Sequence, residues 1–330
     1  MHTAVETLLK ELELGPAHTD GDIVVFPIMT PPRGPAYLTL AEALERRLLT
    51  VTEVSPGGAV SELRVVSTAD VPVLMLDGEE LAGAKQNRVL NTSVLVGAHQ
   101  TLVIPVSCTE QGRWSYVSDV FCDSGIVMSC HVRARKNLSV ATSLAQRGAP
   151  VSDQATVWES VAAMQEAAGV ASPTGAMRDV YTARRKSLEH AVAAFPLLEG
   201  QTGLLVVIDG QPAGWDCVSQ PAAYARLHGK LVASYVLDAL LRPGPAGHAV
   251  AAAFLQQQAR DFIAQAHACQ ERAFKSVGCG EDYRYRDGQI VGSALVFQDT
   301  VVHAAFFRAD AEHHGGRMSG LASRRRHRLE

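Results

Sequence analysis

Two short polar segments carry the side chains of this sequence that are best suited to chemistry. The first runs from Glu79 to Arg88 and the second from Cys108 to Trp114. Each follows an apolar stretch rich in β-branched residues, so each is expected at the end of a strand. Polar groups of several kinds that converge on neighbouring strand ends are the usual construction of a ligand or substrate site. The sequence therefore predicts one site built from both segments.

The first segment combines acidic, amide and basic groups within a few positions. Its candidate catalytic residues are Glu79 and Glu80, and its candidate ligand-binding residues are Lys85, Gln86, Asn87 and Arg88. If the incoming strand includes its last residues, Gln86 and Arg88 share one face and present donors side by side. Such an arrangement suits a phosphate or a carboxylate. The alternative is that these charged groups simply pair with one another.

The second segment adds a thiol, an acid, a cation and an aromatic ring. Cys108 is a candidate nucleophile if a nearby arginine favours its thiolate, and Glu110 is a candidate general acid or base. Arg113 is a candidate phosphate ligand, and Trp114 offers a surface for a base or sugar. The competing interpretation of Cys108 is a buried, inert residue, because free cysteine is among the most buried residue types.

Other candidates are more isolated. Asp216 follows a predicted hairpin, where it is either a second acid or a turn residue. His303 lies in the middle of an apolar strand, which favours a hydrogen-bonded core histidine over a ligand. The sequence contains no His-Glu-x-x-His metal motif, no Gly-x-Ser-x-Gly elbow and no Gly-x-Gly-x-x-Gly fingerprint. It therefore predicts no metal site and identifies no cofactor.

Composition narrows the class of protein. The chain has 330 residues, of which 47% are hydrophobic and 19% charged, so we expect a globular protein and not a disordered one. A net charge of −4 argues against nucleic acid as a partner of the whole chain. The basic run Arg324–Arg328 is interpreted as a solvated tail, with phosphate binding as the alternative.

The cellular location is predicted from the membrane-span and signal segments that the sequence does not show. No window approaches the length of about 20 apolar residues that a membrane span requires, and the first residues do not form a secretory signal. Six scattered cysteines without an export signal favour reduced thiols in the cytoplasm. A homo-oligomer is compatible with the sequence, which does not determine the oligomeric state.

Hydrophobic periodicity predicts an α+β fold, with a β-rich N-terminal sandwich or open barrel, a helical middle segment and a mixed C-terminal part. The predicted parts are an N-terminal helix in 1–20, a β-rich region carrying the polar motifs in 21–136, a helical segment in 137–195, an α+β region packed with the first in 196–310, and a flexible basic tail in 311–330.

Individual elements follow from local signals. Thr39 and Glu42 form a predicted capping box at the start of a helix over 40–49. The other predicted helices cover 138–146, 153–168 with Ser152 as N-cap, 177–194, 224–241 and 246–265. Predicted strands in the region of the motifs include 71–76, 88–96, 101–107 and 114–117.

The polar segments also resemble a known family. Asp77–Arg88, Asn91-Thr92 and Ile104–Trp114 are similar to the ADP-ribosylglycohydrolase and rhodanese-phosphatase-superfamily-associated protein domain. The resemblance extends to Arg135–Ser139, Ser152–Gln154 and Gly210–Asp216, and covers most of residues 20–307. It implies a role in NAD or ADP-ribose metabolism and a functional link to ADP-ribosylglycohydrolase-type enzymes.

The resemblance is compatible with a small phosphorylated ligand, such as ADP-ribose or NAD. Arg88 and Arg113 would bind its pyrophosphate, and Trp114 would contact its adenine or ribose. The three glutamates would act on ribose hydroxyls or in acid–base chemistry. Nothing in the residues themselves selects ADP-ribose over another phosphorylated ligand.

Four hypotheses follow. The leading one is an enzyme that cleaves or transfers at a glycosidic or phosphoester bond of an ADP-ribose-like substrate, with Glu80 or Glu110 as acid or base. The second is a non-catalytic module that binds or senses such a nucleotide. The third is a thiol enzyme that uses Cys108. The fourth is a structural or interaction protein without a ligand.

Overall fold

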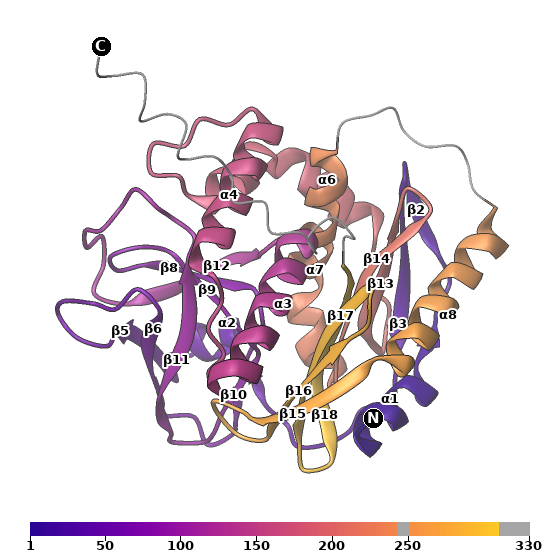
Figure 1. Cartoon of the computed structure of the whole chain (residues 1–330), viewed down its shortest axis with the longest axis horizontal. Helices are drawn as coiled ribbons and strands as arrows, with labels where there is room; N and C mark the ends of the chain where they lie inside the picture. Colours follow the sequence, from indigo (N-terminus) through magenta and orange to yellow (C-terminus); the bar gives the residue numbers. More distant parts are fainter. Residues whose placement is uncertain (243–250, 310–330) are drawn as a thin grey trace.

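The computed structural model describes residues 1–242 and 251–309, which contain eight helices and eighteen strands. The strands form a large sheet, a second sheet and a small third one (Figure 1). This arrangement confirms the predicted α+β class with a strand-rich N-terminal part. Within the described residues, no helix combines the length and apolar character needed to cross a membrane. The predicted basic tail and residues 246–250 lie outside the described residues.

The large sheet joins the two ends of the chain. Its order is β1-β3-β13-β14-β18-β17-β16-β15, with β2 paired to β3, and all of its pairs are antiparallel. The early strand β3 therefore lies beside β13, and belongs to the same sheet as the strands of the last third. The members are β1 (Glu13–Leu14), β2 (His18–Asp20), β3 (Ile23–Met29), β13 (Gln201–Ile208), β14 (Gln211–Val218), β15 (Gln270–Lys275), β16 (Glu281–Arg286), β17 (Ile290–Phe297) and β18 (Thr300–Arg308).

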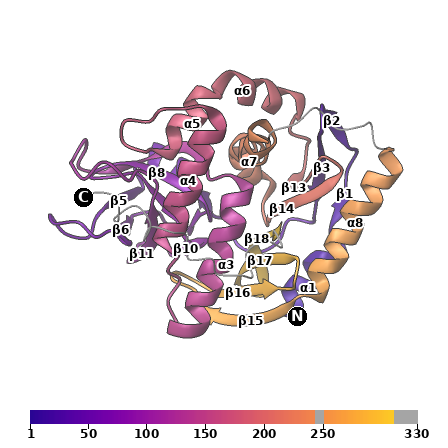
Figure 2. The ribbon, with the colours of Figure 1, turned by 45° about the horizontal axis from the view of Figure 1, so that its top comes forward.

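Helices cover both faces of this sheet, as Figure 2 shows. α1 (Thr3–Glu11) and α8 (Ala252–Ala268) pack on one face through an apolar core of their own. The other face carries the largest core, whose helices are α3 (Cys130–Arg147), α4 (Gln154–Ala168), α5 (Met177–Ala183), α6 (Arg185–Ala194) and α7 (Pro221–Leu241). Because both faces are covered, every residue of β13 is buried.

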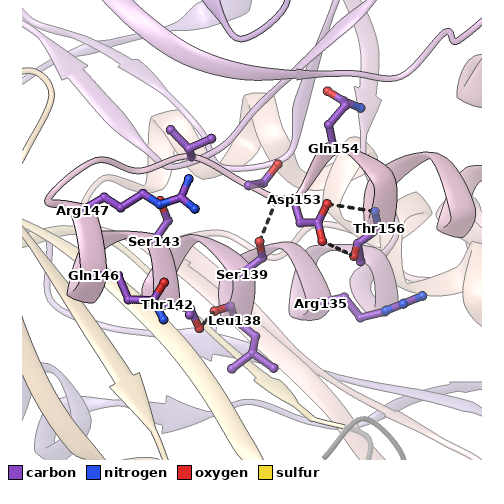
Figure 3. Close-up of a pocket in the computed structure, with 12 residues that line it drawn as sticks. Arg135, Leu138, Ser139, Thr142, Ser143, Gln146, Arg147, Asp153, Gln154 and Thr156 are labelled. Atoms are coloured by element: carbon purple, nitrogen blue, oxygen red, sulfur yellow. Dashed lines mark hydrogen bonds between the residues drawn. The ribbon is translucent and has the colours of Figure 1, made fainter. Parts of the chain in front are cut away.

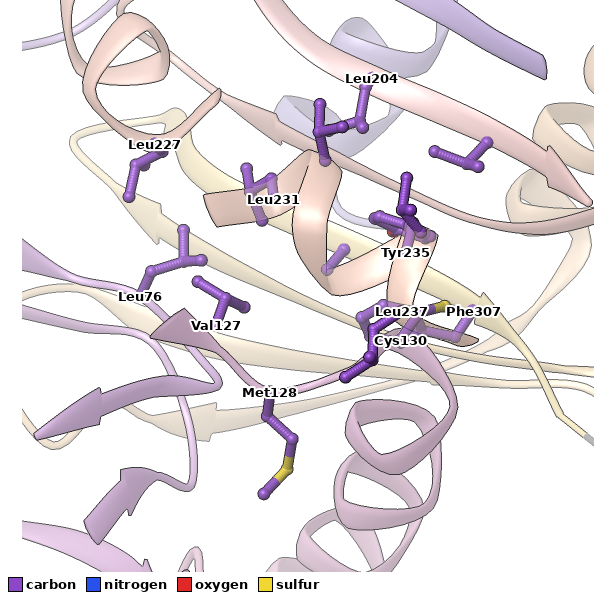
Figure 4. Close-up of a cluster of buried hydrophobic side chains, with 14 of the residues drawn as sticks. Leu76, Val127, Met128, Cys130, Leu204, Leu227, Leu231, Tyr235, Leu237 and Phe307 are labelled. Carbon is purple, nitrogen blue, oxygen red and sulfur yellow. The ribbon is translucent and has the colours of Figure 1, made fainter. Parts of the chain in front are cut away.

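The second and third sheets lie on the far side of α3 and α7. The six-stranded sheet has the order β12-β8-β9-β11-β6-β5, and the small one the order β10-β7-β4. Their elements are β4 (Leu38–Thr39), α2 (Leu40–Glu45), β5 (Leu49–Glu53), β6 (Glu62–Ser67), β7 (Val73–Met75), β8 (Glu79–Gly83), β9 (Arg88–Leu90), β10 (Val94–Val96), β11 (Thr101–Cys108) and β12 (Phe121–Val127). Figure 4 shows Leu76, Val127 and Met128 of this region packed near Leu231 of α7.

Local signals explain several element boundaries. The capping box of Thr39 and Glu42 is present, as predicted. Helix α4 ends at Gly169, which adopts the left-handed conformation that glycine favours at this position. Its N-cap is Asp153 and not the predicted Ser152, because the Asp153 carboxylate accepts the first free N–H groups of the helix.

Two other local predictions were wrong. Residues 114–117 form a loop instead of a strand, and 88–96 form two short strands that pair in different sheets. The predicted helices over 138–146 and 177–194 are present, but the first starts earlier, at Cys130, and the second divides at Arg184 into α5 and α6. Tertiary pairing, which a single sequence does not reveal, decides the strand assignments.

A buried ionic network fixes α3 against the large sheet. The Arg133 guanidinium donates from Nη1 to Asp216 Oδ2 at 2.9 Å and from Nη2 to Oδ1 at 2.7 Å. Tyr235 of α7 donates its hydroxyl to the same carboxylate at 2.7 Å, and His303 Nε2 lies 3.2 Å from Oδ1. Asp216 is thus a buried strand residue and not a turn residue, whereas the prediction of a hydrogen-bonded core histidine is confirmed.

One helical turn further along α3, the same network reaches the strand-rich N-terminal region. The Lys136 ammonium contacts the Asp77 carboxylate, in the turn between β7 and β8, and donates to the carbonyl of Leu90 at 2.7 Å. The N–H of Asp77 donates to Ser93 Oγ at 2.8 Å, and this oxygen lies 2.8 Å from His303 Nδ1. Helix α3 is therefore bonded to both sheets through groups that water does not reach.

The charges of Arg133 and Asp216 hold each other in their ionised forms. Burial alone would raise the pKa of Asp216, but the Arg133 guanidinium and the hydrogen bond with His303 lower it. Burial likewise lowers the pKa of Arg133, but Asp216 outweighs this effect and raises it. Each charge therefore depends on its partner, and removal of one would leave the other buried and uncompensated.

We predict that Asp216→Asn lowers the free energy of unfolding by about 3–5 kcal/mol, because it leaves the Arg133 cation buried without a counter-charge. Denaturation in urea, followed by circular dichroism, measures this loss. Glu11→Gln is the matched control, since it removes an acid from the exposed pair with Arg33, and we expect a loss of about 1 kcal/mol or less. Equal losses of unfolding free energy in Asp216→Asn and Glu11→Gln would contradict the role of Asp216 as the buried counter-charge of Arg133.

Candidate functional site

The two polar motifs lie side by side on adjacent strands. β9 pairs antiparallel with β11, which places Arg88 opposite Cys108 and Val89 opposite Ser107. β8 pairs with β9, so Glu80 lies opposite Val89 in the same sheet. The expected meeting of the two strand ends is therefore observed. What their side chains face, however, is mostly the protein interior.

Arg113 acts as a clamp between the two motifs. It donates to Glu110 Oε2 at 2.6 Å, to the carbonyl of Ala84 at 2.7 Å and to Asn87 Oδ1 at 3.2 Å. Glu110 also accepts from the N–H of Asn87 at 3.2 Å and from the Thr174 hydroxyl at 2.8 Å. Burial raises the pKa of Glu110, but the bonds from Arg113 and Thr174 outweigh it, so the pKa is lowered. The carboxylate is charged and occupied.

Arg88 is buried and only partly engaged, because its Nε and Nη2 have no hydrogen-bond partner in the described part of the chain. Its Nη1 donates to Gln86 Oε1 at 3.1 Å, so these two side chains face each other and not a shared ligand. The guanidinium lies 5.5 Å from the ring centroid of Trp114, and the Lys85 ammonium lies 5.3 Å from it. Gln86 and Arg88 are buried, whereas Trp114 is 45% exposed. Of this group, Trp114 presents the largest surface to solvent.

Glu79 and Glu80 are adjacent in β8, and they differ in whether a cation lies beside them. Glu79 pairs with Lys230 at 2.9 Å, and Lys230 also binds Asp123 at 2.7 Å. Glu80 has no ion pair among the described residues, and its Oε1 accepts a hydrogen bond from the Thr109 hydroxyl at 2.7 Å. Its Oε2 has no hydrogen-bond partner in the described part of the chain. Burial raises the pKa of Glu80 to about 7, so its proton is exchanged near neutrality.

Cys108 is a buried thiol whose backbone is bound by a residue of α4. Burial raises its pKa to about 11, and the Arg88 guanidinium offsets only part of that rise. The thiolate of a nucleophilic cysteine is therefore not favoured here. Gln154 makes two hydrogen bonds to this residue, accepting from its N–H at 2.8 Å and donating to its carbonyl at 2.9 Å. Through Gln154, the second motif borders a cavity.

This α3–α4 cavity has a volume of about 600 Å³ and lies between the outer side of α3 and the segment that leads into α4 (Figure 3). Its wall on α3 is a stripe at helical spacing. The lining residues are Arg135, Leu138, Ser139, Thr142, Ser143, Gln146, Arg147, Val151, Ser152, Asp153, Gln154 and Thr156. The stripe spans twelve positions, or about 18 Å at the rise of an α-helix. The volume is typical of small-molecule sites.

The chemistry of the cavity wall is hydroxylic and cationic. Arg147 is exposed and makes no ion pair with a described residue, while Arg135 donates to Ser160 at 2.9 Å. The Asp153 carboxylate is occupied by the N–H groups of Ala155 and Thr156 as the N-cap of α4. The hydroxyls of Thr142, Ser143 and Thr156 donate within the protein, so they offer a ligand only their oxygen lone pairs. The wall can therefore bind an anionic group near Arg147 and accept hydrogen bonds from a polyol along the hydroxyls.

Residues from two stretches that the sequence analysis did not assign to the site, Arg135–Ser139 and Ser152–Gln154, line this cavity together. None of the ten residues predicted for the site lies in the wall of this cavity. The hydrogen bonds between Ser107, Ser152 and Asn91 connect the two regions. The polar side chains of these two stretches were the signal that the sequence offered. Residues 139 and 152 are 13 positions apart, and the turn after α3 brings the two stretches together.

The fold and the cavity define an α+β protein with a polar cavity of ligand size between two helices. The chain matches the ARG and Rhodanese-Phosphatase-superfamily-associated Protein domain over residues 11–307, and it belongs to that family. The resemblance found in the polar segments is confirmed at the level of the family. No curated protein and no solved structure gives a significant match.

We predict that Glu80 makes stability fall as the pH rises from about 4.5 to about 7. The folded state keeps a proton over this range that the unfolded chain loses near the ordinary pKa of 4.5, so the free energy of unfolding decreases by about 3 kcal/mol. Glu80→Gln should remove this decrease and be more stable than the wild type at pH 8. Urea denaturation at several pH values measures both effects.

Glu110→Gln is the matched control for Glu80→Gln, because it makes the same chemical change in an acid whose pKa is lowered. It should destabilise the protein at pH 8, where Glu110 is charged and bound by Arg113. A stability change of the same sign in both variants at pH 8 would show that the two acids do not differ as described.

Proposed function

We propose that this protein binds an ADP-ribose-like nucleotide in the α3–α4 cavity. The observation that carries the proposal is the wall of this cavity, which combines exposed Arg147 with a row of hydroxyl groups in a volume of about 600 Å³. The guanidinium supplies charge-assisted donors for a phosphate, and the hydroxyls suit a sugar. The length of the stripe favours a ligand longer than a mononucleotide.

The family supports the same class of ligand at a coarser level. Its name associates it with ARG and rhodanese-phosphatase proteins, which is compatible with a role related to ADP-ribose. The polar motifs then have a supporting role in the proposal: Gln154 fixes Cys108 to the start of α4, and Ser152 and Ser107 fix the segment that closes the cavity. Arg88 and Arg113 hold the strands in place from within.

We predict that Arg147→Gln weakens the binding of ADP-ribose by about 10- to 100-fold, the value of one charge-assisted hydrogen bond. Titration calorimetry with the full chain measures the affinity, and adenosine and ribose serve as ligands without phosphate. Arg260→Gln is the control, because Arg260 is an exposed arginine of α8 on the other face of the large sheet. Equal affinities of wild type and Arg147→Gln for ADP-ribose would contradict the proposal.

A second candidate function is hydrolysis of a glycosidic bond in the same class of ligand. It requires the ligand to bind at the polar motifs, because neither Glu80 nor Glu110 lines the α3–α4 cavity. It is favoured by one observation, the opposed pKa values of Glu80, raised to about 7, and Glu110, lowered. A catalytic acid and a catalytic base can be assigned where the surroundings of two titratable groups move their pKa values apart. Glu80 would donate its proton to the leaving group, and Glu110 would accept a proton from the water that bonds to the sugar carbon.

Turnover of ADP-ribose, NAD or an ADP-ribosylated peptide, followed by chromatography, tests this second candidate. A glycosidase requires turnover by the wild type and a loss of about 100-fold or more in Glu80→Gln and in Glu110→Gln, each with its fold retained. Saturable binding without turnover would support the binding module and reject the hydrolase. Alkylation of Cys108 that leaves turnover intact would exclude a mechanism through this thiol.

A further inference from the structure

A second cavity, which we call the arginine groove, lies on the other side of α3. Its volume is about 600 Å³, and it is bounded by the last turns of α3, by the edge strand β15 and by its neighbour β16. Figure 3 shows Thr142 and Gln146 of α3 pointing toward these pale C-terminal strands and away from the segment before α4. Helix α3 therefore separates the arginine groove from the α3–α4 cavity, and the two share its rim.

Three arginines face the groove from neighbouring positions in the sheet. Arg272 of β15 is the register partner of Arg284 in β16, and Arg286 lies two residues further, opposite Gln270. Because side chains alternate along a strand, Arg284 and Arg286 point to the same face. All three arginines line the cavity, and so does Phe274, which lies two residues from Arg272 on the same strand face. The pairing thus concentrates cations along one wall.

The positive charge is only partly compensated. Arg284 is 4% exposed, and its Nη2 donates to Asp282 at 2.6 Å and to Thr92 at 2.7 Å. Its Nε and Nη1 are buried and have no hydrogen-bond partner in the described part of the chain. Buried donors without acceptors are unfavourable, and an anion that lies against them would restore the missing bonds.

The other two arginines have even fewer partners. Arg272 and Arg286 are exposed and make no ion pair with the residues that the structure describes. One further carboxylate, that of Asp287, lines the groove and accepts from the N–H of Gly288 at 2.6 Å. Three guanidinium groups therefore face two carboxylates, and both carboxylates already accept hydrogen bonds. The balance favours an anionic ligand with more than one negative charge.

We infer that the arginine groove is a second ligand site, which binds the phosphates of a nucleoside diphosphate. Arg272, Arg284 and Arg286 provide the planar donors that match phosphate oxygens. The half-buried ring of Phe274 offers an apolar surface for the base next to them. The site does not depend on the α3–α4 cavity, and its ligand would contact α3 from the opposite side.

The experiment measures ADP binding by calorimetry in the Arg147→Gln background, so that the α3–α4 cavity does not contribute. Adding Arg272→Gln and Arg286→Gln together should weaken ADP binding by at least about tenfold, since two charged contacts are lost. Inorganic pyrophosphate should compete with ADP, and adenosine should not. Lys275→Gln is the matched control, because it removes one cation from the same strand outside the groove and should leave ADP affinity unchanged.

Unchanged ADP affinity in the arginine variant would overturn the inference, and so would an equal loss in Lys275→Gln. Binding of a single-stranded oligonucleotide that is lost in the arginine variant, without any binding of ADP, would assign the groove to nucleic acid and also overturn it. These outcomes are separate from those of the proposed function. If ADP-ribose affinity depended on Arg272 and Arg286 and not on Arg147, the α3–α4 proposal would fail while the groove remained a ligand site.

Discussion

The position of α3 depends on the pair formed by Arg133 and Asp216 inside the protein. The guanidinium and the carboxylate meet through two hydrogen bonds where neither is exposed. Lys136 and Asp77 form a second such pair, which lies one helical turn away and joins α3 to the opposite sheet. Buried pairs add little net stability, because desolvation offsets much of their attraction. We infer that their geometry contributes instead to the specificity with which α3 is placed.

This placement has consequences for both cavities. The inner side of α3 is committed to the ionic network, and its outer side divides the surface into the α3–α4 cavity and the arginine groove. Neither cavity is lined by residues of the Glu79–Arg88 motif. Asp77, just before that motif, belongs to the network, and Arg113 of the second motif binds Glu110. The residues of the two polar motifs thus belong mostly to the protein interior behind the two cavities.

Sequence patterns predicted some of these features. The class of fold, the capping box of Thr39 and the end of α4 follow from local rules, because their causes lie within a few residues. The meeting of the motifs was also predictable, since both end neighbouring strands. The direction of the side chains was not: whether Arg88 faces a ligand or Gln86 depends on what packs above the sheet. The surroundings of Arg284 could not be predicted either, because its hydrogen-bond partner Thr92 lies 192 residues away in the sequence.

We propose ligand binding at α3, whereas the sequence predicts it at the polar motifs. Hydrogen exchange of the full chain, measured by mass spectrometry with and without ADP-ribose, tests this difference, because it locates the ligand without any substitution. We expect slower exchange in peptides from the end of α3 and the start of α4, residues 139–156, with Glu79–Arg88 unchanged. Protection confined to Glu79–Arg88 and Cys108–Trp114 would contradict binding at α3.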